Sequence, residues 1–211
     1  MVYAIAVAAA YLIGSIPFGF IVGKMRGVDV RTVGSKNIGA TNVFRTVGKK
    51  WGLLAFACDF LKGLIPTLAA RYYAASSGDA SLQAYLPLVV GVTCVAGHMF
   101  TCFMKFKGGK GIATGFGMLV ALIPLLVLAA FALFIIIVST FHYISLGSIC
   151  AAAFLLVAVW LPCAILSNPE GYRNLPQCIM VALVAAFAIW KHRTNIKRLL
   201  AGNENRFRWK S

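Results

Sequence analysis

The residues best suited to chemistry gather in short polar segments between long apolar stretches, and the first of these segments covers residues 34–45. Its sequence, GSKNIGATNVFR, alternates glycines with hydroxyl, amide and cationic side chains. Glycines let backbone N–H groups approach a phosphate, hydroxyls and amides add donors, and an arginine binds two oxygens at once. The segment predicts an anion-binding loop, although an ordinary polar loop at a membrane interface has a similar composition.

A second glycine-rich segment, FKGGKG at residues 106–111, directly precedes an apolar stretch that begins at Ile112. Free N–H groups and the positive dipole end of a helix starting there should point into the aqueous layer and attract an anion. The segment lacks the G-x-x-x-x-G-K-[ST] spacing of a nucleotide-binding loop. Lysines at the end of a span also often extend toward lipid headgroups, so both readings stay open.

A third polar segment, KHRTNIKRLL at residues 191–200, follows the last apolar stretch. If a helix continues through it, His192 and Asn195, three residues apart, share one face. A run of cations that stops transfer across the membrane explains the lysines and arginines. It does not explain a histidine and an amide on a common face, so these two residues are candidates for the site.

Asp59 and Lys62 lie inside an apolar stretch, where ionisable residues are costly unless they are paired or functional. Their i, i+3 spacing permits a local ion pair. Structural and functional roles are both open, since Asp59 could also orient a cation of a loop. His98, near the end of the next stretch, is more typical of a hydrogen-bonded packing residue than of a ligand.

The sequence offers no set of metal ligands and no nucleophilic triad. The three histidines, His98, His142 and His192, are far apart, the five acidic residues do not cluster, and no cysteines have C-x-x-C spacing. We therefore expect no metal and no cofactor. Any reaction should use an already activated substrate, with the protein supplying position and positive charge.

A membrane-embedded scaffold must position these segments. The chain is 61% hydrophobic and only 12% charged, with a mean hydropathy of +0.86, whereas soluble domains are about 25% charged. A span needs about 20 apolar residues. We expect an all-α integral membrane protein, with residues 1–211 in a single membrane-embedded domain and no separate soluble domain. The apolar stretches cover residues 2–22, 51–73, 82–104, 112–138, 146–166 and 175–190.

The distribution of charge predicts the topology. Of 20 lysines and arginines, 17 lie in residues 23–50, 105–111 and 191–211, which the positive-inside rule assigns to the cytoplasm. The N-terminus is then outside. The C-terminus is inside if Pro124 breaks the stretch 112–138 into two helices of about 11 to 15 residues, each too short to span alone. We expect about seven helices, with the active site in cytoplasmic polar loops.

The net charge of +15 does not indicate nucleic acid, because basic loops beside apolar spans are what the positive-inside rule produces. The cations are instead available to anionic headgroups of membrane lipid or to phosphorylated substrates.

A series of motifs is spread over nearly the whole chain, from Gly14 to about Asn205: GSIPFGFIVGK, GSKNIGATNVFR, DFLKG, GHMF, FKGGKG, SLGS and KHRTNIKRLL. In these motifs the chain resembles the bacterial acyl-phosphate-dependent glycerol-3-phosphate acyltransferases. The resemblance implies transfer of a fatty acyl group from acyl phosphate to the sn-1 hydroxyl of glycerol 3-phosphate, giving lysophosphatidic acid and phosphate. This is the first step of phospholipid synthesis. It also implies seven spans in the bacterial cytoplasmic (inner) membrane, and a soluble upstream enzyme that makes acyl phosphate.

The resemblance also implies which residues form the site. By motif match, a first phosphate cradle contains Gly34, Ser35, Asn37, Thr41, Asn42 and Arg45. A second contains Gly108, Gly109 and Lys110, with Lys107 nearby, while Ser145, His192 and Asn195 close the pocket. We expect catalytic roles for Ser35, Arg45, Lys110, His192 and Asn195, and substrate binding by the others. Arg45 and Lys110 should hold glycerol 3-phosphate, which arrives from water as a dianion.

The general base is not fixed by the motifs. Other glycerol phosphate acyltransferases carry an H-x-x-x-x-D pair, but here His98 is followed five residues later by Phe103. An acyl phosphate has a good leaving group, so a substrate phosphate oxygen can take the hydroxyl proton in a metal-independent, substrate-assisted reaction. His192 is the alternative base.

Three other functions compete with an acyltransferase. A transporter of organic phosphates usually has two halves with related broken helices, and no internal repeat is visible. A phosphotransferase acting on nucleotide-activated lipids needs clustered acidic metal ligands, which five acidic residues hardly permit. A purely structural membrane subunit would not require both glycine-rich loops.

Overall fold

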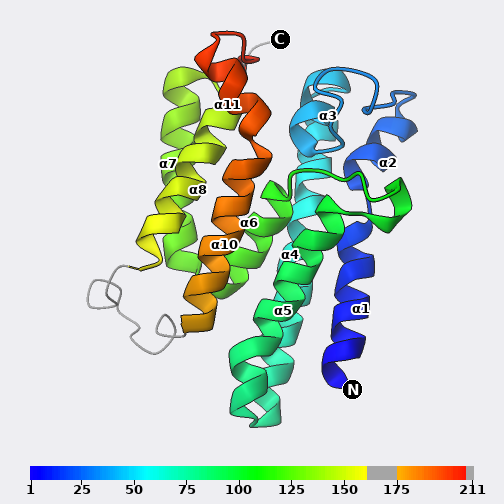
Figure 1. Ribbon diagram of the computed structural model, residues 1–211. Helices are drawn as coiled ribbons and strands as arrows, with labels where there is room; N and C mark the ends of the chain where they lie inside the picture. Colours follow the sequence, from blue (N-terminus) through cyan, green and yellow to red (C-terminus); the bar gives the residue numbers. More distant parts are fainter. Residues whose placement is uncertain (161–174, 208–211) are drawn as a thin grey trace. The chain divides into compact units, whose positions relative to one another are not determined.

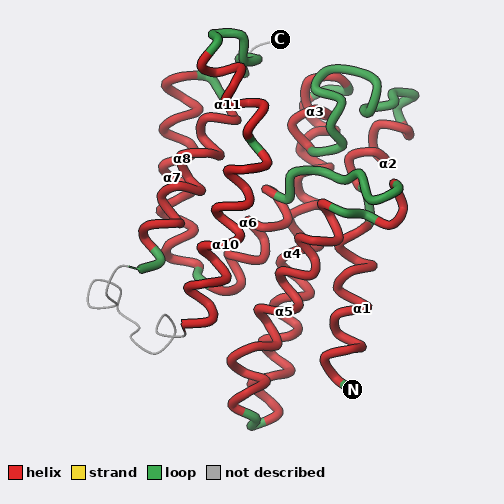
Figure 2. Tube along the Cα trace, viewed as in Figure 1, coloured by secondary structure: helices red, strands yellow, loops and turns green. Residues whose placement is uncertain are grey.

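The computed structural model describes residues 1–160 and 175–207, and these residues form helices and loops without a strand (Figure 2). They fall into two compact units, Met1–Leu122 and Ile123–Ser211. The predicted all-helical class is confirmed. The single-domain boundary of 1–211 stays a prediction.

The first unit is built around α4 and α5, which are joined by a tight turn (Figure 1). Gly78 ends α4 with a φ of +69°, and Asp79 caps α5 by accepting hydrogen bonds from the N–H groups of Ser81 and Leu82. The two helices therefore run antiparallel, so α4 begins and α5 ends toward the same end of the unit. Its elements are α1 (Val2–Ser15), α2 (Phe18–Met25), α3 (Ala40–Thr46), α4 (Lys49–Ser77), α5 (Ala80–Met99), η1 (Cys102–Met104) and α6 (Ile112–Leu122).

Small residues let these helices pack backbone to backbone. A Cβ on Gly63 or Gly117 of α4 and α6 would overlap the backbone of the other helix, at Thr114 and Phe60 respectively. Gly14 of α1 meets the backbone of Cys94 in α5 in the same way. Close approach of this kind is typical of helices in membranes, where dispersion and not water exclusion drives their association.

The first apolar stretch is interrupted between α1 and α2. Pro17 has no N–H group to continue the helix, and the carbonyl groups of Ser15 and Ile16 receive hydrogen bonds from side chains of other segments. The Thr101 hydroxyl donates to Ser15 O at 2.6 Å, and Lys62 Nζ donates to Ile16 O at 2.7 Å. The break is thus stabilised by side chains far away in sequence, and both pieces belong to one interrupted span, Val2–Met25.

The second unit contains α7 (Pro124–Phe141), α8 (Ile144–Ala158), α10 (Leu175–Lys191) and α11 (Arg193–Leu200). α8 packs against both α7 and α10. The predicted break at Pro124 is confirmed, because α6 ends at Leu122 and Pro124 starts α7. The expectation that both halves would be too short to span is wrong for α7, which has 18 residues. Proline is favourable in the first turn of a helix, and α7 continues beyond Val138 to Phe141.

A continuous helix through residues 191–200 is not what the structure has. His192 separates α10 from α11, and the two helices are bent by 52°. The bend falls where the apolar stretch ends and a strongly amphipathic, cationic helix begins, so that the cations can remain in water. His192 and Asn195 consequently do not share the face of one straight helix.

Four segments among the described residues are long and apolar enough to cross a membrane: Val2–Met25, Lys49–Ser77, Ala80–Met104 and Pro124–Phe141. The bent pair Leu175–Lys191 and Arg193–Leu200 makes a fifth if it counts as one span. Ile112–Leu122 and Ile144–Ala158 are apolar but shorter. The predicted count of seven is therefore not confirmed.

Candidate active site

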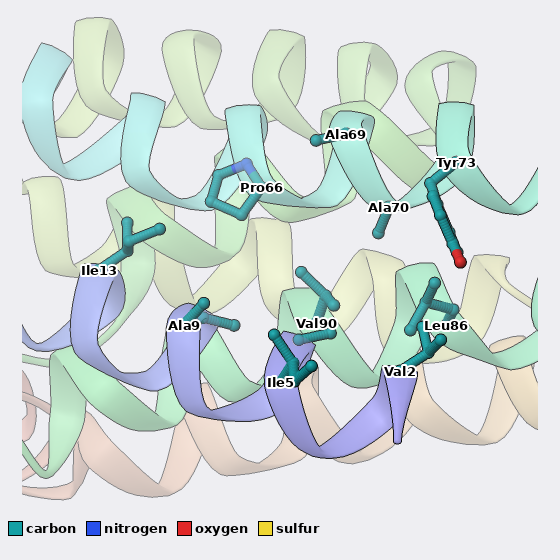
Figure 3. A pocket seen from close by; sticks show the side chains of 12 residues that line it. Val2, Ile5, Ala9, Ile13, Pro66, Ala69, Ala70, Tyr73, Leu86 and Val90 are labelled. Carbon is teal, nitrogen blue, oxygen red and sulfur yellow. The ribbon is translucent and has the colours of Figure 1, made fainter.

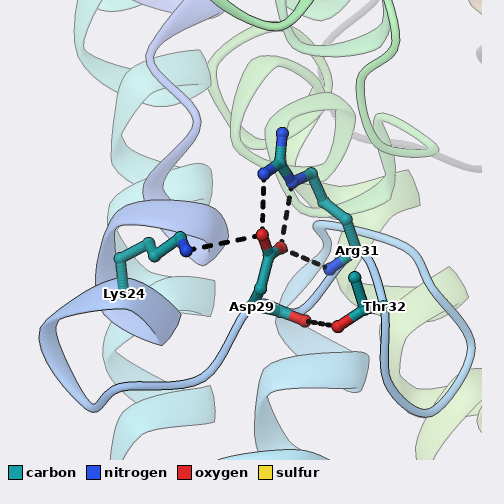
Figure 4. A network of polar contacts seen from close by, with 4 residues as sticks. All are labelled: Lys24, Asp29, Arg31 and Thr32. Carbon is teal, nitrogen blue, oxygen red and sulfur yellow. Dashed lines mark hydrogen bonds and ion pairs between the residues drawn. The ribbon is translucent and has the colours of Figure 1, made fainter.

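The first loop, between α2 and α3, is anchored at its start by an ion cluster (Figure 4). Asp29 accepts hydrogen bonds from Arg31 Nε at 2.9 Å and Arg31 Nη2 at 2.7 Å, and Lys24 Nζ lies 3.5 Å from the same carboxylate. The hydrogen bonds from Arg31 hold the pKa of Asp29 well below its ordinary value. Lys24 at the end of α2 and Arg31 of the loop are therefore engaged with Asp29 and do not belong to the predicted anion cradle.

Asn42 ties the loop to the start of α3. Its side chain is buried, with 1% of the residue exposed, and its Oδ1 accepts a hydrogen bond from Ser35 N at 2.8 Å. Its Nδ2 donates to Val30 O at 2.7 Å and to Val33 O at 3.2 Å. The structure thus gives Asn42 a positioning role, and its predicted contact with substrate stays a prediction.

Close contact with Asn42 also explains the glycine that begins the motif. Gly34 has a φ of +60°, and a Cβ there would overlap the Asn42 side chain. Asn37 Oδ1 accepts from Gly39 N at 2.8 Å, which shapes the approach to α3. The loop leaves Ser35 exposed, with Thr41 and Arg45 half-buried on α3. The predicted residues Gly34, Ser35 and Asn42 are therefore in direct contact.

The second loop, residues 106–111, folds back onto the end of α5. Gly108 N donates to Met99 O at 3.0 Å, and Gly109 N donates to His98 O at 3.1 Å. The carbonyl groups at the end of α5 therefore take these two N–H groups, and the predicted binding of substrate by Gly108 and Gly109 stays a prediction. Lys107 is exposed and Lys110 half-buried, just ahead of α6. Their predicted contacts with phosphate stay predictions.

The predicted pair inside α4 is present. Lys62 Nζ lies 2.7 Å from Asp59 Oδ1, and both side chains are buried. His98 of α5 lies beside the same carboxylate, with its Nδ1 3.5 Å from Asp59 Oδ1.

In the second unit, the Glu204 carboxylate accepts hydrogen bonds from three polar side chains. Its Oε1 accepts from Ser145 Oγ at 2.9 Å and from Asn195 Nδ2 at 2.8 Å, and its Oε2 accepts from Arg198 Nε at 2.7 Å. Burial raises the pKa of Glu204, but the hydrogen bonds from Arg198, Asn195 and Ser145 outweigh it and lower that pKa below its ordinary value. Glu204 stays ionised and fixes two predicted site residues.

Sequence reasoning missed Glu204. A single carboxylate in a tail rich in cations, a few residues after a polar helix, is a signal that was present in the sequence. The tail also contacts the connection between α7 and α8: Phe207 N donates to His142 O at 2.6 Å, and Arg206 Nε donates to Tyr143 Oη at 3.1 Å. The residues after α11 thus form part of the polar end of this unit.

His192 is buried, and its Nδ1 lies 2.8 Å from the carbonyl oxygen of Ala188. A carbonyl only accepts hydrogen bonds, so we assign the proton to Nδ1. In the neutral ring Nε2 then carries the lone pair that a general base needs. The structure thus brings Gly34, Ser35 and Asn42 together in the first unit, and Ser145 and Asn195 together at Glu204 in the second. The combination of the predicted residues into one pocket stays a prediction.

An apolar groove lies between α1, α4 and α5 and has a volume of about 450 Å³. Figure 3 shows Ile5, Ala9 and Ile13 of α1 facing Pro66 of α4 and Val90 of α5 across it. None of the predicted site residues lines it, and its lining holds no charged group that could bind phosphate. Among the described residues, no three histidines, cysteines, aspartates or glutamates group as a metal site would require.

A crystal structure described as PlsY (YgiH), an integral membrane glycerol 3-phosphate acyltransferase in its glycerol 3-phosphate form, has the same fold. The TM-score is 0.84 at 39% identity, covering 99% of this chain and 96% of that chain. With its apolar helices and cationic polar loops, the present chain is accordingly an all-helical integral membrane protein of the acyltransferase class.

Residues 4–202 match the family model described as glycerol-3-phosphate acyltransferase. The glycerol-3-phosphate acyltransferase of Trichlorobacter lovleyi is 48% identical over 203 residues, 96% of both chains. That of Geobacter sulfurreducens is 44% identical over 205 residues, 97% of both chains. The chain belongs to the glycerol-3-phosphate acyltransferase family, whose members act in phospholipid biosynthesis.

Proposed function

We propose that the chain transfers a fatty acyl group from acyl phosphate to the sn-1 hydroxyl of glycerol 3-phosphate, releasing lysophosphatidic acid and inorganic phosphate. The family supports the acceptor. The related crystal structures are described as a glycerol 3-phosphate form and a lysophosphatidic acid form, at 39% and 38% identity. Ser35, Arg45, Lys110, His192 and Asn195 act in catalysis, and the other predicted residues bind substrate.

The observation that carries the choice of donor is the position of His98. This histidine is buried beside Asp59 and beneath Gly109, where an attacking hydroxyl cannot reach it. The first unit therefore has no accessible histidine base, oriented by a carboxylate, that could assist attack on a less activated acyl donor such as a thioester. An acyl phosphate compensates for this, because its phosphate is a good leaving group and its own oxygens can take a proton.

The reaction balances without another reactant. The sn-1 oxygen attacks the acyl carbon, the bond from that carbon to the phosphate oxygen breaks, and phosphate leaves with the electron pair. The hydroxyl proton goes either to a substrate phosphate oxygen or to Nε2 of His192. Arg45 and Lys110 offset the negative charge of the two phosphates, which would otherwise repel each other in the transition state.

The proposed setting is the bacterial cytoplasmic membrane, with the N-terminus outside and the C-terminus and active site in the cytoplasm. The charge asymmetry of the loops supports it. A soluble upstream enzyme would deliver acyl phosphate from the same side. A topology reporter fused after Ser211 should be active only in the cytoplasm, and activity only outside would overturn this orientation and the count of seven spans.

The reaction is tested with purified protein in lipid nanodiscs, given acyl phosphate and labelled glycerol 3-phosphate without added metal, acyl-CoA or acyl carrier protein. Phosphate and lysophosphatidic acid should appear in equal amounts, with the acyl group at sn-1, and a chelator should have no effect. Product formation only from acyl-CoA or acyl carrier protein would overturn the donor. Complete loss of turnover in chelator, restored by a divalent cation, would overturn metal independence.

A further inference from the structure

Three buried ionisable side chains of the first unit meet where α1, α4 and α5 pack together. Lys62 Nζ lies 2.7 Å from Asp59 Oδ1, and His98 Nδ1 lies 3.5 Å from the same oxygen. Only 2% of the Asp59 and Lys62 side chains and 4% of His98 are exposed. Ionisable groups inside a membrane protein are costly unless they serve a purpose, and the proposed reaction uses none of these three.

Lys62 connects this cluster to the break between α1 and α2. Its Nζ donates to Ile16 O at 2.7 Å and lies 5.5 Å from the centre of the Phe18 ring. The carbonyl of Ile16 is one that the interruption at Pro17 takes out of the helix. The ammonium group therefore fixes the point from which α2 leaves, and α2 leads directly into the first loop.

His98 connects the cluster to the glycine-rich loop. Its carbonyl oxygen accepts a hydrogen bond from Gly109 N at 3.1 Å, and its imidazole lies directly against the Cα of Gly109. A Cβ on Gly109 would overlap Nε2 and would lie 2.9 Å from Cε1 and 3.1 Å from Cδ2 of the same ring. The glycine-rich loop thus packs against the imidazole at Gly109, the residue immediately before Lys110.

Asp59 lies between Lys62 and His98 and contacts both of them. It neutralises Lys62 and faces Nδ1 of the His98 ring, whereas Gly109 meets Nε2 of the same ring. At 3.5 Å the separation from Nδ1 is longer than a well-formed hydrogen bond, so the carboxylate acts on the ring through its charge and its bulk. Access from solvent is closed, which excludes proton exchange with a substrate.

We propose that Asp59, Lys62 and His98 form a positioning network that fixes the glycine-rich loop, and with it Lys110, relative to the break between α1 and α2. This inference rests on the proposed function, in which Lys110 binds phosphate. The three residues are positioning residues: they determine where the loop lies and do not touch the reacting atoms.

A double-mutant cycle between Gly109 and His98 tests the central contact. Gly109→Ala should raise KM for glycerol 3-phosphate and lower kcat/KM roughly 100-fold, because the methyl group must displace the loop from the imidazole. In the His98→Ala background the same methyl group finds space. In that background Gly109→Ala should lower kcat/KM by a factor about ten times smaller, and kcat should change little. Equal costs in both backgrounds would overturn the proposal.

Gly115→Ala is the matched control. It adds a methyl group to another buried glycine nearby, but the nearest atom to its Cβ is Val95 Cγ2 at 3.9 Å, an ordinary contact. This variant should keep the KM for glycerol 3-phosphate and the thermal unfolding midpoint of the wild type. A rise in KM as large as that of Gly109→Ala would show that any added methyl disturbs the site, and would overturn the specific role of His98.

The ion pair is tested separately from folding. Asp59→Asn strands a buried ammonium group, so it should destabilise the protein and can prevent folding. The double variant Asp59→Asn with Lys62→Met removes both charges and should recover a cooperative thermal transition. Its KM for glycerol 3-phosphate should stay raised about tenfold or more, because Ile16 O keeps only the hydrogen bond from Phe18 N next to it and loses the one that ties the break to α4. A double variant with wild-type KM and kcat would show that the pair serves folding alone.

Failure of this inference differs from failure of the proposed function. The wild type is assayed first with acyl phosphate. If it transfers acyl groups only from another donor, the donor assignment fails, and the same cycle is run with that donor because it depends only on KM for glycerol 3-phosphate. If acyl phosphate is used and the cycle is additive, the function stands and the network has no positioning role.

Discussion

Replacing Asn42 with aspartate changes the first loop by one group and should leave a distinctive dependence on pH. The Asn42 amide donates to Val30 O and Val33 O and accepts from Ser35 N. In Asn42→Asp the accepting oxygen is kept, but an oxygen replaces Nδ2 at 2.7 Å from Val30 O. At neutral pH the introduced carboxylate has no proton to place between these two acceptors.

The size of the effect follows from the bonds that are lost. Two hydrogen bonds are worth about 1 kcal/mol each, and an unpartnered buried carbonyl costs roughly 1 to 3 kcal/mol more. Val30 is completely buried, so water cannot replace the lost donor. We expect a total of about 3 to 5 kcal/mol, or a fall in kcat/KM for glycerol 3-phosphate of roughly 150- to 5,000-fold at neutral pH.

Lowering the pH should restore much of this activity. Burial disfavours the charged form and raises the pKa of the introduced carboxyl. Once protonated, the carboxyl donates to Val30 O as the amide did. The assay is kcat/KM of the variant divided by that of the wild type between about pH 5.5 and pH 8, so that titration of the substrate phosphate cancels.

Asn42→Ala is the control, because it removes the same donors and has nothing to titrate, so its ratio to the wild type should be low and flat. The reasoning is refuted if Asn42→Asp retains wild-type activity at neutral pH. It is refuted equally if the activity of Asn42→Asp, relative to the wild type, is as flat as that of Asn42→Ala.

Three further substitutions test other parts of the site. Arg45→Lys keeps the charge but loses the planar group that binds two oxygens; losing one charge-assisted hydrogen bond of about 1.5 to 3 kcal/mol should lower kcat/KM roughly 10- to 150-fold. Lys110→Ala should lower kcat/KM further, because the charge and its donors both disappear. Lys210→Ala, outside every motif, is the control and should match the wild type. Normal turnover by folded Arg45→Lys and Lys110→Ala would mean that the basic loops serve only as topology signals. The lowered pKa of Glu204 means that its contribution to stability is present above the ordinary carboxyl pKa and is lost as pH falls through the lowered value. Limited proteolysis should therefore show the tail released only in acid for the wild type, and already at neutral pH for Glu204→Gln, where the charge that holds Arg198 is gone; identical profiles would contradict this role.

The sequence predicted those features that depend on neighbours along the chain. Apolar stretches of sufficient length gave the long helices, Pro124 gave the break before α7, and the i, i+3 spacing of Asp59 and Lys62 gave their ion pair. In each case the relevant partner lies within one or two turns. Local chemistry therefore decides the outcome, whatever the rest of the chain does.

Features that depend on distant partners were missed or mistaken. Glu204 meets Ser145 from 59 residues away, and nothing in the local sequence of either residue indicates the other. The N–H groups of Gly108 and Gly109 are bound by carbonyls that become available only where α5 ends. The bend at His192 likewise follows from where the apolar stretch meets the cationic segment, whereas helical spacing alone favours a straight continuation.

The hydrogen bond from Thr101 to Ser15 has a consequence for how the protein is made. Ser15 and Thr101 are 86 residues apart. The first span therefore leaves the ribosome long before Thr101, whose hydroxyl group donates to the carbonyl of Ser15, has been synthesised. Until then the carbonyl group of Ser15 needs water or the insertion machinery as a partner, because the lipid interior offers none. The first span can reach its final conformation only after α4 and α5 have joined it. A chain truncated before Thr101 should therefore be recognised as unfinished and degraded in the membrane.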